Sequence, residues 1–145
     1  MKSKIIVFII IAIFIVSFSC IIIYSNTKGL KGLEKEVSKI VLPQNIEKIA
    51  IKSKIGDSGG NGEYSTYRVV LLVKTEMTLD ELKQEFENMN LKFSNHYDSC
   101  NNIPIFYITH CEGKIFKSSR SFSLEFNELN EIEDYNNYYF IEFVE

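Results

Sequence analysis

Residues 5–23 read IIVFIIIAIFIVSFSCIII and contain no charged side chain. A run of about 20 apolar residues is what a helix needs to cross the hydrocarbon core of a bilayer. In lipid the backbone must satisfy its own hydrogen bonds, so the run is expected to be helical despite its many β-branched residues. We therefore predict a transmembrane helix over 5–24, with Ile5 and Ile23 at the ends of the membrane-spanning run.

The fate of this helix is open to three interpretations. The first, which we favour, is an anchor that stays uncleaved. The second is a signal peptide, because Ser17 and Ser19 are small residues at the positions that determine cleavage before Cys20. The third is a lipoprotein acylated at Cys20, although Ser17 stands where an aliphatic residue is usual. Cleavage by either route would leave a mature chain whose N-terminus is apolar, with Ile21 at or near its start.

The charges on the two sides of the helix bear on its orientation. Lys2 and Lys4 precede it, and four lysines follow between residues 28 and 39. Lysine counting alone would place the C-terminal side in the cytoplasm. Long domains, however, translocate largely regardless of charge, while a short basic tail is usually retained. We expect a single-pass protein of the cell membrane, with residues 1–4 as a cytoplasmic tail.

Residues 25–44 are predicted to form a stalk. Gly29 and Gly32 suggest a flexible start, and residues 34–42 are long enough for two helical turns before Pro43 ends them. Residues 45–145 then form the extracytoplasmic domain, which is long enough for one core and not two. The formal charge of the whole chain is −3, which gives no basic face of the kind that nucleic acid requires.

Two strands begin the predicted domain. In residues 46–55 apolar and polar side chains alternate, which places Ile49, Ile51 and Ile55 on one face. Residues 64–75 are apolar on both faces, which indicates a central strand. The segment between them ends in Asn61-Gly62, the strongest short hairpin signal.

A helix and further strands follow. Thr78 and Glu81 form a capping box at the start of a helix over 77–90, and apolar residues recur along it at helical spacing. Strands are predicted at 103–111, 121–127 and 138–144, and a short strand at 114–117 merges with its neighbour or stands apart. The order β-β-α-β-β-β predicts an α+β fold, a small antiparallel sheet with one helix packed on one face.

The loop Gly56-Asp57-Ser58-Gly59-Gly60 resembles the nucleophile loop of trypsin-like proteases. In that family the catalytic histidine precedes the serine, whereas His96 and His110 both follow Ser58. An α/β-hydrolase nucleophile needs a turn between a strand and a helix, and Ser58 lies between two predicted strands. We therefore interpret the loop as a glycine-rich hairpin turn and assign no catalytic residue.

A second group of reactive residues lies around residues 96–111. Zinc accepts ligands of these types, but the spacing matches no known finger, and His110 and Cys111 point to opposite faces of a strand. We assign no metal and no cofactor. A disulfide between Cys100 and Cys111 is one expectation for an extracytoplasmic domain, and two buried thiols are the alternative. The residues of the group are His96, Asp98, Cys100, His110 and Cys111.

The C-terminal quarter is acidic and rich in tyrosine. Its carboxylates lack the spacing and the central glycine of an EF-hand, so we expect a solvated acidic loop. Tyr135, Tyr138 and Tyr139 are expected either to form a contact surface or to lie half-buried at a sheet edge. The acidic residues are Glu125, Glu128, Glu131, Glu133, Asp134, Glu142 and Glu145.

Residues 42–90 carry a resemblance to a known type of protein. The stretches LPQNIEKI, GDSGGNGEY and VVLLVKTEMTLDELK resemble small membrane-anchored or lipoprotein-like proteins of clostridia and related low-GC Gram-positive bacteria, which are mostly uncharacterised. The resemblance implies an extracytoplasmic domain behind one N-terminal membrane signal. It implies no activity and no functional residues.

Three functions are compatible with these patterns. The first is a membrane-anchored, non-catalytic domain that binds a partner at the cell surface, with the lipid bilayer and another membrane or cell-surface protein as its partners. The second is an accessory or immunity-type membrane subunit whose helix contacts another membrane protein. The third is a small cell-surface hydrolase using Ser58 or the His/Cys group, which the sequence favours least.

Overall fold

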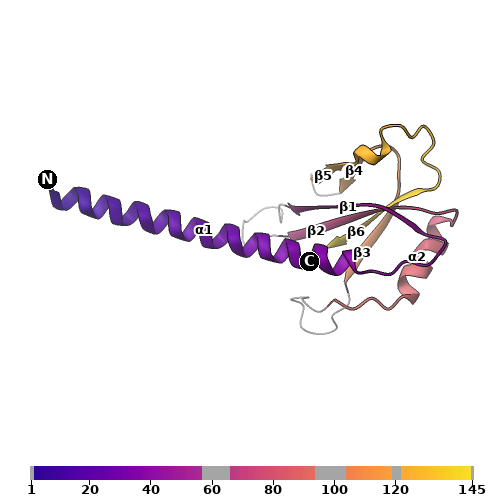
Figure 1. Ribbon diagram of the computed structural model, residues 1–145, viewed down its shortest axis with the longest axis horizontal. Helices are drawn as coiled ribbons and strands as arrows, with labels where there is room; N and C mark the ends of the chain where they lie inside the picture. The colour runs from indigo at the N-terminus through magenta and orange to yellow at the C-terminus, as the bar shows by residue number, and fades with distance from the viewer. Residues whose placement is uncertain (1, 57–65, 94–103, 119–121, 145) are drawn as a thin grey trace.

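The chain folds into a long helix, two antiparallel sheets and a short second helix (Figure 1). The computed structural model describes residues 2–56, 66–93, 104–118 and 122–144. The elements are α1 (Lys2–Ser38), β1 (Glu47–Gly56), β2 (Thr66–Lys74), α2 (Leu79–Asn88), β3 (Ile105–His110), β4 (Ile115–Ser118), β5 (Phe122–Glu125), the 3-10 helix η1 (Asn127–Leu129) and β6 (Tyr138–Val144). The predicted α+β class is confirmed.

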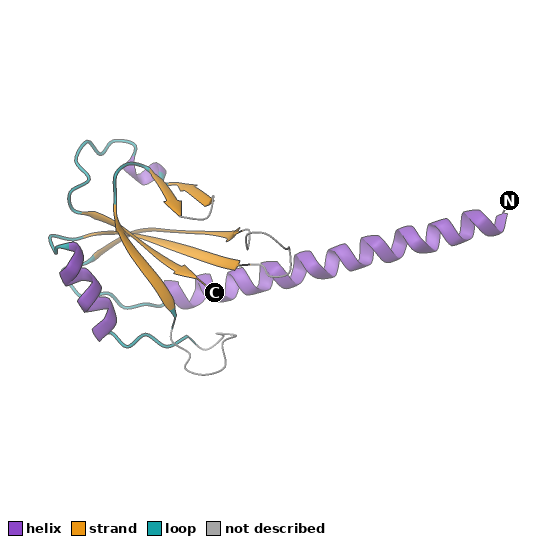
Figure 2. Ribbon diagram, turned by 180° about the vertical axis from the view of Figure 1, so that it is seen from behind, coloured by secondary structure: helices purple, strands orange, loops and turns teal. Residues whose placement is uncertain are grey.

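The main sheet has four antiparallel strands in the order β1-β2-β6-β3. One face, which we name the helix face, is covered by α2 and by the C-terminal part of α1 (Figure 2). The other, which we name the hairpin face, is covered by the two-stranded sheet of β4 and β5. Both faces are buried against another layer, so the sheet has a core on each side.

The first helix runs without a break from the apolar run into the core of the domain. Apolar side chains from Phe8 to Tyr24 are exposed, whereas Leu33 and Val37 of α1 and Ile40 just after it are buried against the helix face. Figure 1 shows the N-terminal part projecting away from the sheet. The flexible start predicted for the stalk is therefore wrong, because α1 continues through it to Ser38 and packs Leu33 and Val37, one helical turn apart, on the sheet.

Gly29 has a packing role that its sequence context does not reveal. A Cβ atom at this position would lie 2.4 Å from the Tyr67 ring of β2. The glycine therefore lets α1 approach the sheet closely, and it does not act as a hinge. At the other end of the contact, Lys48 Nζ of β1 donates to the carbonyl oxygens of Ser38 and Ile40, at 3.0 and 3.3 Å, and satisfies the helix C-terminus.

A bulge in β1 corrects the predicted alternation of that strand. The register with β2 shifts between Lys48 and Ala50, which leaves Ile49 without a partner. Ile49 therefore packs on the hairpin face together with Ala50, and only Ile51 reaches the helix-face core. One extra residue in a strand moves a side chain to the other face, which a strict period of two does not anticipate.

The two central strands confirm the interpretation of residues 64–75. In β2, Val69, Leu71 and Val73 belong to the helix-face core, while Val70 and Leu72 belong to the hairpin-face core. Strand β6 is buried on both faces in the same way. A strand that is apolar on both sides is stable only where both sides are covered.

The short strand at 114–117 does not merge with its neighbour. It forms β4 and pairs with β5, with Phe116 opposite Leu124. Phe116 and Phe126 contact the Phe140 ring of the main sheet, with centroids 5.3 and 5.1 Å apart. The order of elements along the chain after α1 is therefore β-β-α-β-β-β-β, and the strands form two sheets where one was predicted.

The predicted capping box of the second helix is confirmed. The Thr78 backbone N–H donates to Glu81 Oε2 at 2.8 Å, and the Glu81 N–H donates to Thr78 Oγ1. Leu82 and Phe86 are buried on the helix face, and the Phe86 ring lies 5.8 Å from that of Phe106 in β3. The apolar stripe is therefore core, as its helical spacing predicted.

Candidate functional site

The glycine-rich loop joins two antiparallel strands. Gly56 pairs with Thr66, so β1 and β2 form the predicted hairpin. Ser58 lies outside the described residues, and its interpretation as a non-catalytic turn residue remains a prediction. Gly56 itself has a packing role, because a Cβ atom there would lie 2.9 Å from Arg68 Nε. This glycine makes room for a buried arginine.

The His/Cys group is only partly placed. His96, Asp98 and Cys100 lie outside the described residues, so the disulfide to Cys111 remains a prediction. His110 is exposed, its Nε2 lies 3.0 Å from the Asn136 carbonyl oxygen, and its ring meets the edge of Tyr139.

Cys111 lies on the opposite side of the strand from His110. It is buried on the hairpin face, and burial raises the pKa of its thiol. The two side chains therefore diverge, as predicted. Across residues 2–56, 66–93, 104–118 and 122–144, no three side chains of His, Cys, Asp or Glu gather as metal ligands would.

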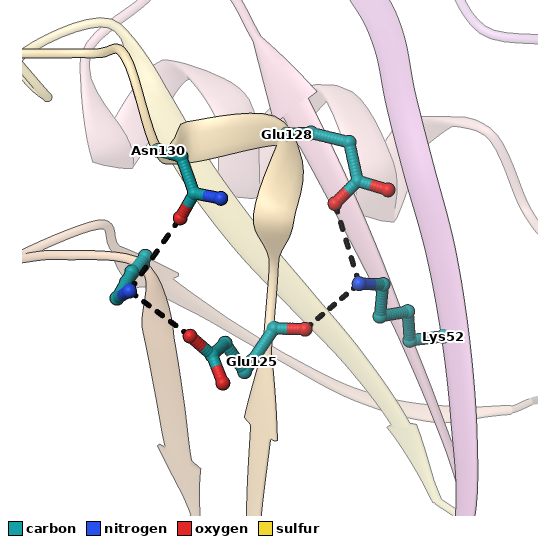
Figure 3. A network of polar contacts seen from close by, with 5 residues as sticks. Lys52, Glu125, Glu128 and Asn130 are labelled. Carbon is teal, nitrogen blue, oxygen red and sulfur yellow. Dashed lines mark hydrogen bonds and ion pairs between the residues drawn. The ribbon is translucent and has the colours of Figure 1, made fainter.

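Part of the acidic segment is used in internal contacts (Figure 3). Lys52 Nζ of β1 lies 3.3 Å from Glu128 Oε2 and donates to the Glu125 carbonyl oxygen at 2.8 Å. Lys114, just before β4, places its Nζ 3.0 Å from Glu125 Oε1 of β5, a contact within the hairpin. The contacts of Lys52 tie the hairpin and the 3-10 helix after it to the edge strand β1, so they fix its position over the sheet.

The C-terminal tyrosines are not a contact surface. Tyr138 and Tyr139 are buried, and Tyr139 donates its hydroxyl to the Met77 carbonyl oxygen at 2.8 Å. Tyr135 packs partly buried against the hairpin-face core. The expected half-burial is confirmed for Tyr135 alone, whereas Tyr138 and Tyr139 are buried because β6 lies between β2 and β3 and has no free edge.

A buried ion pair lies on the hairpin face. Arg68 of β2 and Glu142 of β6 are 4% and 6% exposed, and Arg68 Nη1 donates to Glu142 Oε1 and, at 2.6 Å, to Ser118 Oγ of β4. The guanidinium also lies over the Phe122 ring at 5.6 Å. Desolvation makes such a pair costly to bury, but removing one partner costs more, because the other charge is left alone.

The free edge of β3 is the most accessible binding feature of the described fold. The Cys111 N–H donates to the Tyr138 carbonyl oxygen, so the backbone of Cys111 points toward β6. In an antiparallel ladder such residues alternate, and the next ones along β3 are Thr109, Tyr107 and Ile105. The backbone groups of Phe106, Ile108 and His110 therefore point away from β6, toward the edge.

Side chains on the hairpin face of β3 are only partly covered. Ile105, Tyr107 and Thr109, which we name the β3 strip, lie opposite Val144, Glu142 and Phe140 of β6. Ile105 is 52% exposed and Tyr107 is 57% exposed. The hairpin covers β1, β2 and β6 but stops short of this strip.

A groove continues from the β3 strip toward β4. It has a volume of about 640 Å³ and is lined by Thr109 and His110 of β3, by Phe116 and Lys117 of β4, and by Phe140 beneath. Its walls thus combine aromatic rings with His110, Lys114 and Lys117 and with the carboxylate of Glu112. A groove beside an uncapped strand offers side-chain pockets next to backbone donors and acceptors.

Sequence reasoning missed both the buried pair and the β3 strip. Glu142 is the single charge inside the apolar run YYFIEFV, which is a signal that a partner must be buried with it. The run IFYITH in β3 has no Lys, Arg, Asp or Glu, a signal that becomes informative only when the strand is known to be an edge.

Comparisons of the chain with protein-family models, with characterised proteins and with solved structures give no match. The fold and the groove are therefore interpreted from their own chemistry.

Proposed function

We propose that this chain is a single-pass membrane protein whose extracytoplasmic domain binds an extended polypeptide segment along the edge of β3, without catalysis. The observation that carries the proposal is the free edge of β3, with the outward backbone groups of Phe106, Ile108 and His110. Only another backbone in extended conformation pairs with all of them at once. The occupant is therefore a strand, and the β3 strip and the groove select its side chains.

The anchor is supported by the surface of α1. This helix is long and apolar enough to cross a membrane. Its side chains from Phe8 to Tyr24 are exposed, so no other described part of the chain covers them. An apolar surface of that size needs lipid or another helix around it in water.

The opposite edge of the sheet supports the choice of β3. Strand β1 carries Lys48, Lys52 and Lys54 and a bulge, which are devices that prevent an edge from pairing with other chains. Strand β3 contains no Lys, Arg, Asp or Glu, and its one basic side chain is His110. The sheet is thus protected at one edge and open at the other.

The anchor is tested on cells that express the full chain. We expect the protein to resist extraction by alkaline carbonate, residues 45–145 to be digested by protease added to intact cells, and the intact mass to match the uncleaved chain. Extraction by carbonate would contradict the anchor. A mass corresponding to cleavage at Cys20 would replace the helix with a lipid anchor or a secreted domain.

The binding edge is tested with the full chain in nanodiscs, used to select linear peptides from a random displayed library. We expect a selected peptide to slow hydrogen exchange at the outward amides of Phe106, Ile108 and His110. The double variant Ile105→Lys/Tyr107→Lys should weaken binding about tenfold, the loss expected from two cross-strand contacts.

The matched control is Val41→Lys, which adds a charge at an exposed site away from β3. It should bind the selected peptide as the unmodified chain does. Peptides that protect other amides, or that bind the double variant equally well, would show that β3 is not the binding edge.

A further inference from the structure

The continuous helix fixes the height of the domain above the bilayer. Ile23 is the last residue of the apolar run, and Gly29 already lies against Tyr67 of the sheet. Six residues of helix span about 9 Å. Since the polar layer of a bilayer is about 5–8 Å thick on each side of its hydrocarbon, the near end of the sheet lies against the outer boundary of the headgroups, within reach of lysine side chains.

The strand registers identify the residues at this end. Lys54 of β1 pairs with Arg68 of β2, which pairs with Val144 of β6, which pairs with Ile105 of β3. These four residues form a row across the sheet near the ends of β1 and β6. The bond from Arg68 to Ser118 brings the end of β4, with Lys117, to the same level.

Among the described residues, the exposed charges at the near end that are not paired with an opposite charge are basic. Lys54 and Lys117 are exposed, and so are Lys28 and Lys31 on the side of α1 away from the sheet. The described acids at this level are engaged: Glu142 pairs with Arg68, and Glu34 accepts a hydrogen bond from Ser53.

The far end of the domain is acidic. Helix α2 and the segment after β5 lie there, on the side away from the projecting part of α1 (Figure 1). The exposed carboxylates of these two segments are Asp80, Glu81, Glu87, Glu128, Glu131, Glu133 and Asp134. The charge is thus separated along the long axis of the molecule, with its positive end toward the proposed membrane.

We propose that Lys28, Lys31, Lys54 and Lys117 form a docking surface for the headgroups of anionic phospholipids. The proposal rests on the membrane anchor of the proposed function. An anionic surface attracts the basic near end and repels the acidic far end, so it selects one orientation of the domain. Ile55 and Ile105, both partly exposed at the same level, enter the polar layer between the lysines.

The test uses the full chain in nanodiscs of phosphatidylcholine, alone or mixed with phosphatidylglycerol. A lipid with a gadolinium chelate on its headgroup broadens nearby methyl signals. We expect the Ile55 and Ile105 methyl signals to broaden more in the anionic discs, and the effect to shrink at high salt. Ile46 and Ile132, at the far end, should change little in either lipid.

Two variants that each remove two positive charges test whether this surface is the docking site. Lys54→Gln/Lys117→Gln should lower the ratio of docked to undocked domain about twenty-five-fold, since each lysine near an anionic surface contributes about fivefold. Lys83→Gln/Lys92→Gln removes the same charge on and just after α2 and should leave the ratio unchanged. Methyl shifts of buried isoleucines such as Ile141 report whether either variant perturbs the fold.

Several outcomes would overturn the proposal. Equal broadening in neutral and anionic discs would exclude a role for lipid charge. An equal effect of the two variants would show a response to net charge alone and not to this surface. If the protein inserts into the discs but the Ile55 and Ile105 signals do not broaden, the anchor stands and the docking surface is overturned. Failure to insert would overturn the anchor itself.

Discussion

The two faces of the main sheet are closed by different means. The helix face is covered by α1 and α2 over an apolar core that includes Leu33, Leu82 and Phe143. The hairpin face carries a smaller core, a buried ion pair and a strip of β3 that its cover does not reach. The comparison teaches that the helix face is closed by apolar packing, whereas the hairpin face combines packing with a buried charge pair and leaves part of one described strand uncovered.

The largest effect should come from breaking the ion pair on the hairpin face. Glu142→Gln leaves the Arg68 guanidinium buried without a counter-charge, which should lower the free energy of unfolding by about 3–5 kcal/mol. The double variant Arg68→Met/Glu142→Leu removes both charges and should recover most of that loss. Denaturant unfolding of the full chain in micelles, followed by circular dichroism, gives both values, and equal losses in the two variants would contradict this account.

The next largest effect should come from the helix face. Leu33 is 2% exposed, and Leu33→Ala should cost about 3 kcal/mol through lost transfer energy and a residual cavity. The matched control is Val41→Ala, because Val41 is 85% exposed and its loss should change stability by less than about 0.5 kcal/mol. Similar losses for the two residues would mean that the end of α1 does not pack as described.

A smaller effect is expected at the start of α2. Thr78→Ala removes the capping interaction and should cost about 1 kcal/mol at neutral pH. Hydrogen bonds from the Thr78 backbone and side chain lower the pKa of Glu81 below its ordinary 4.5.

The stabilisation from this carboxylate is therefore present above about pH 4.5 and is lost as the pH falls through the lowered pKa. Unfolding measured from neutral to acidic pH should show the Thr78→Ala difference shrinking in acid. A difference that stays constant with pH would exclude a contribution from the Glu81 charge.

The smallest effect on stability should come from the β3 strip. Tyr107→Thr replaces one residue of high strand propensity by another at an exposed position and should change the free energy of unfolding by less than about 0.5 kcal/mol. The same variant should weaken the binding of a selected peptide. A large loss of stability would mean that Tyr107 belongs to the core, and the contrast between the two faces would then be lost.

Elements with local signals were predictable from the sequence. The capping box depends on Thr78 and Glu81 alone, and the two apolar faces of residues 64–75 identify a central strand without knowledge of its neighbours. Gly29 was misleading because glycine in a linker and glycine at a close helix-to-sheet contact look alike until Tyr67 is placed beside it.

The candidate site was less predictable because it depends on strand order. IFYITH and YYFIEFV have similar composition, yet β3 is an edge and β6 is central. Which of the two has a free side is decided by long-range pairing and not by either stretch. The bulge at Ile49 was unpredictable for the same reason, since the register of β1 is set by its partner strand β2.

The unbroken helix through Gly29 joins the proposed anchor to the sheet without a joint. From Ile23 to Ser38 this helix rises about 22 Å. In the proposed membrane setting, a change in bilayer thickness would change the tilt of the spanning segment, and the sheet would swing with it. A shift in the lipid phase or a neighbouring helix that leans on α1 would thereby re-aim the open strand edge, so the protein would convert mechanical changes in the membrane into exposure of its groove.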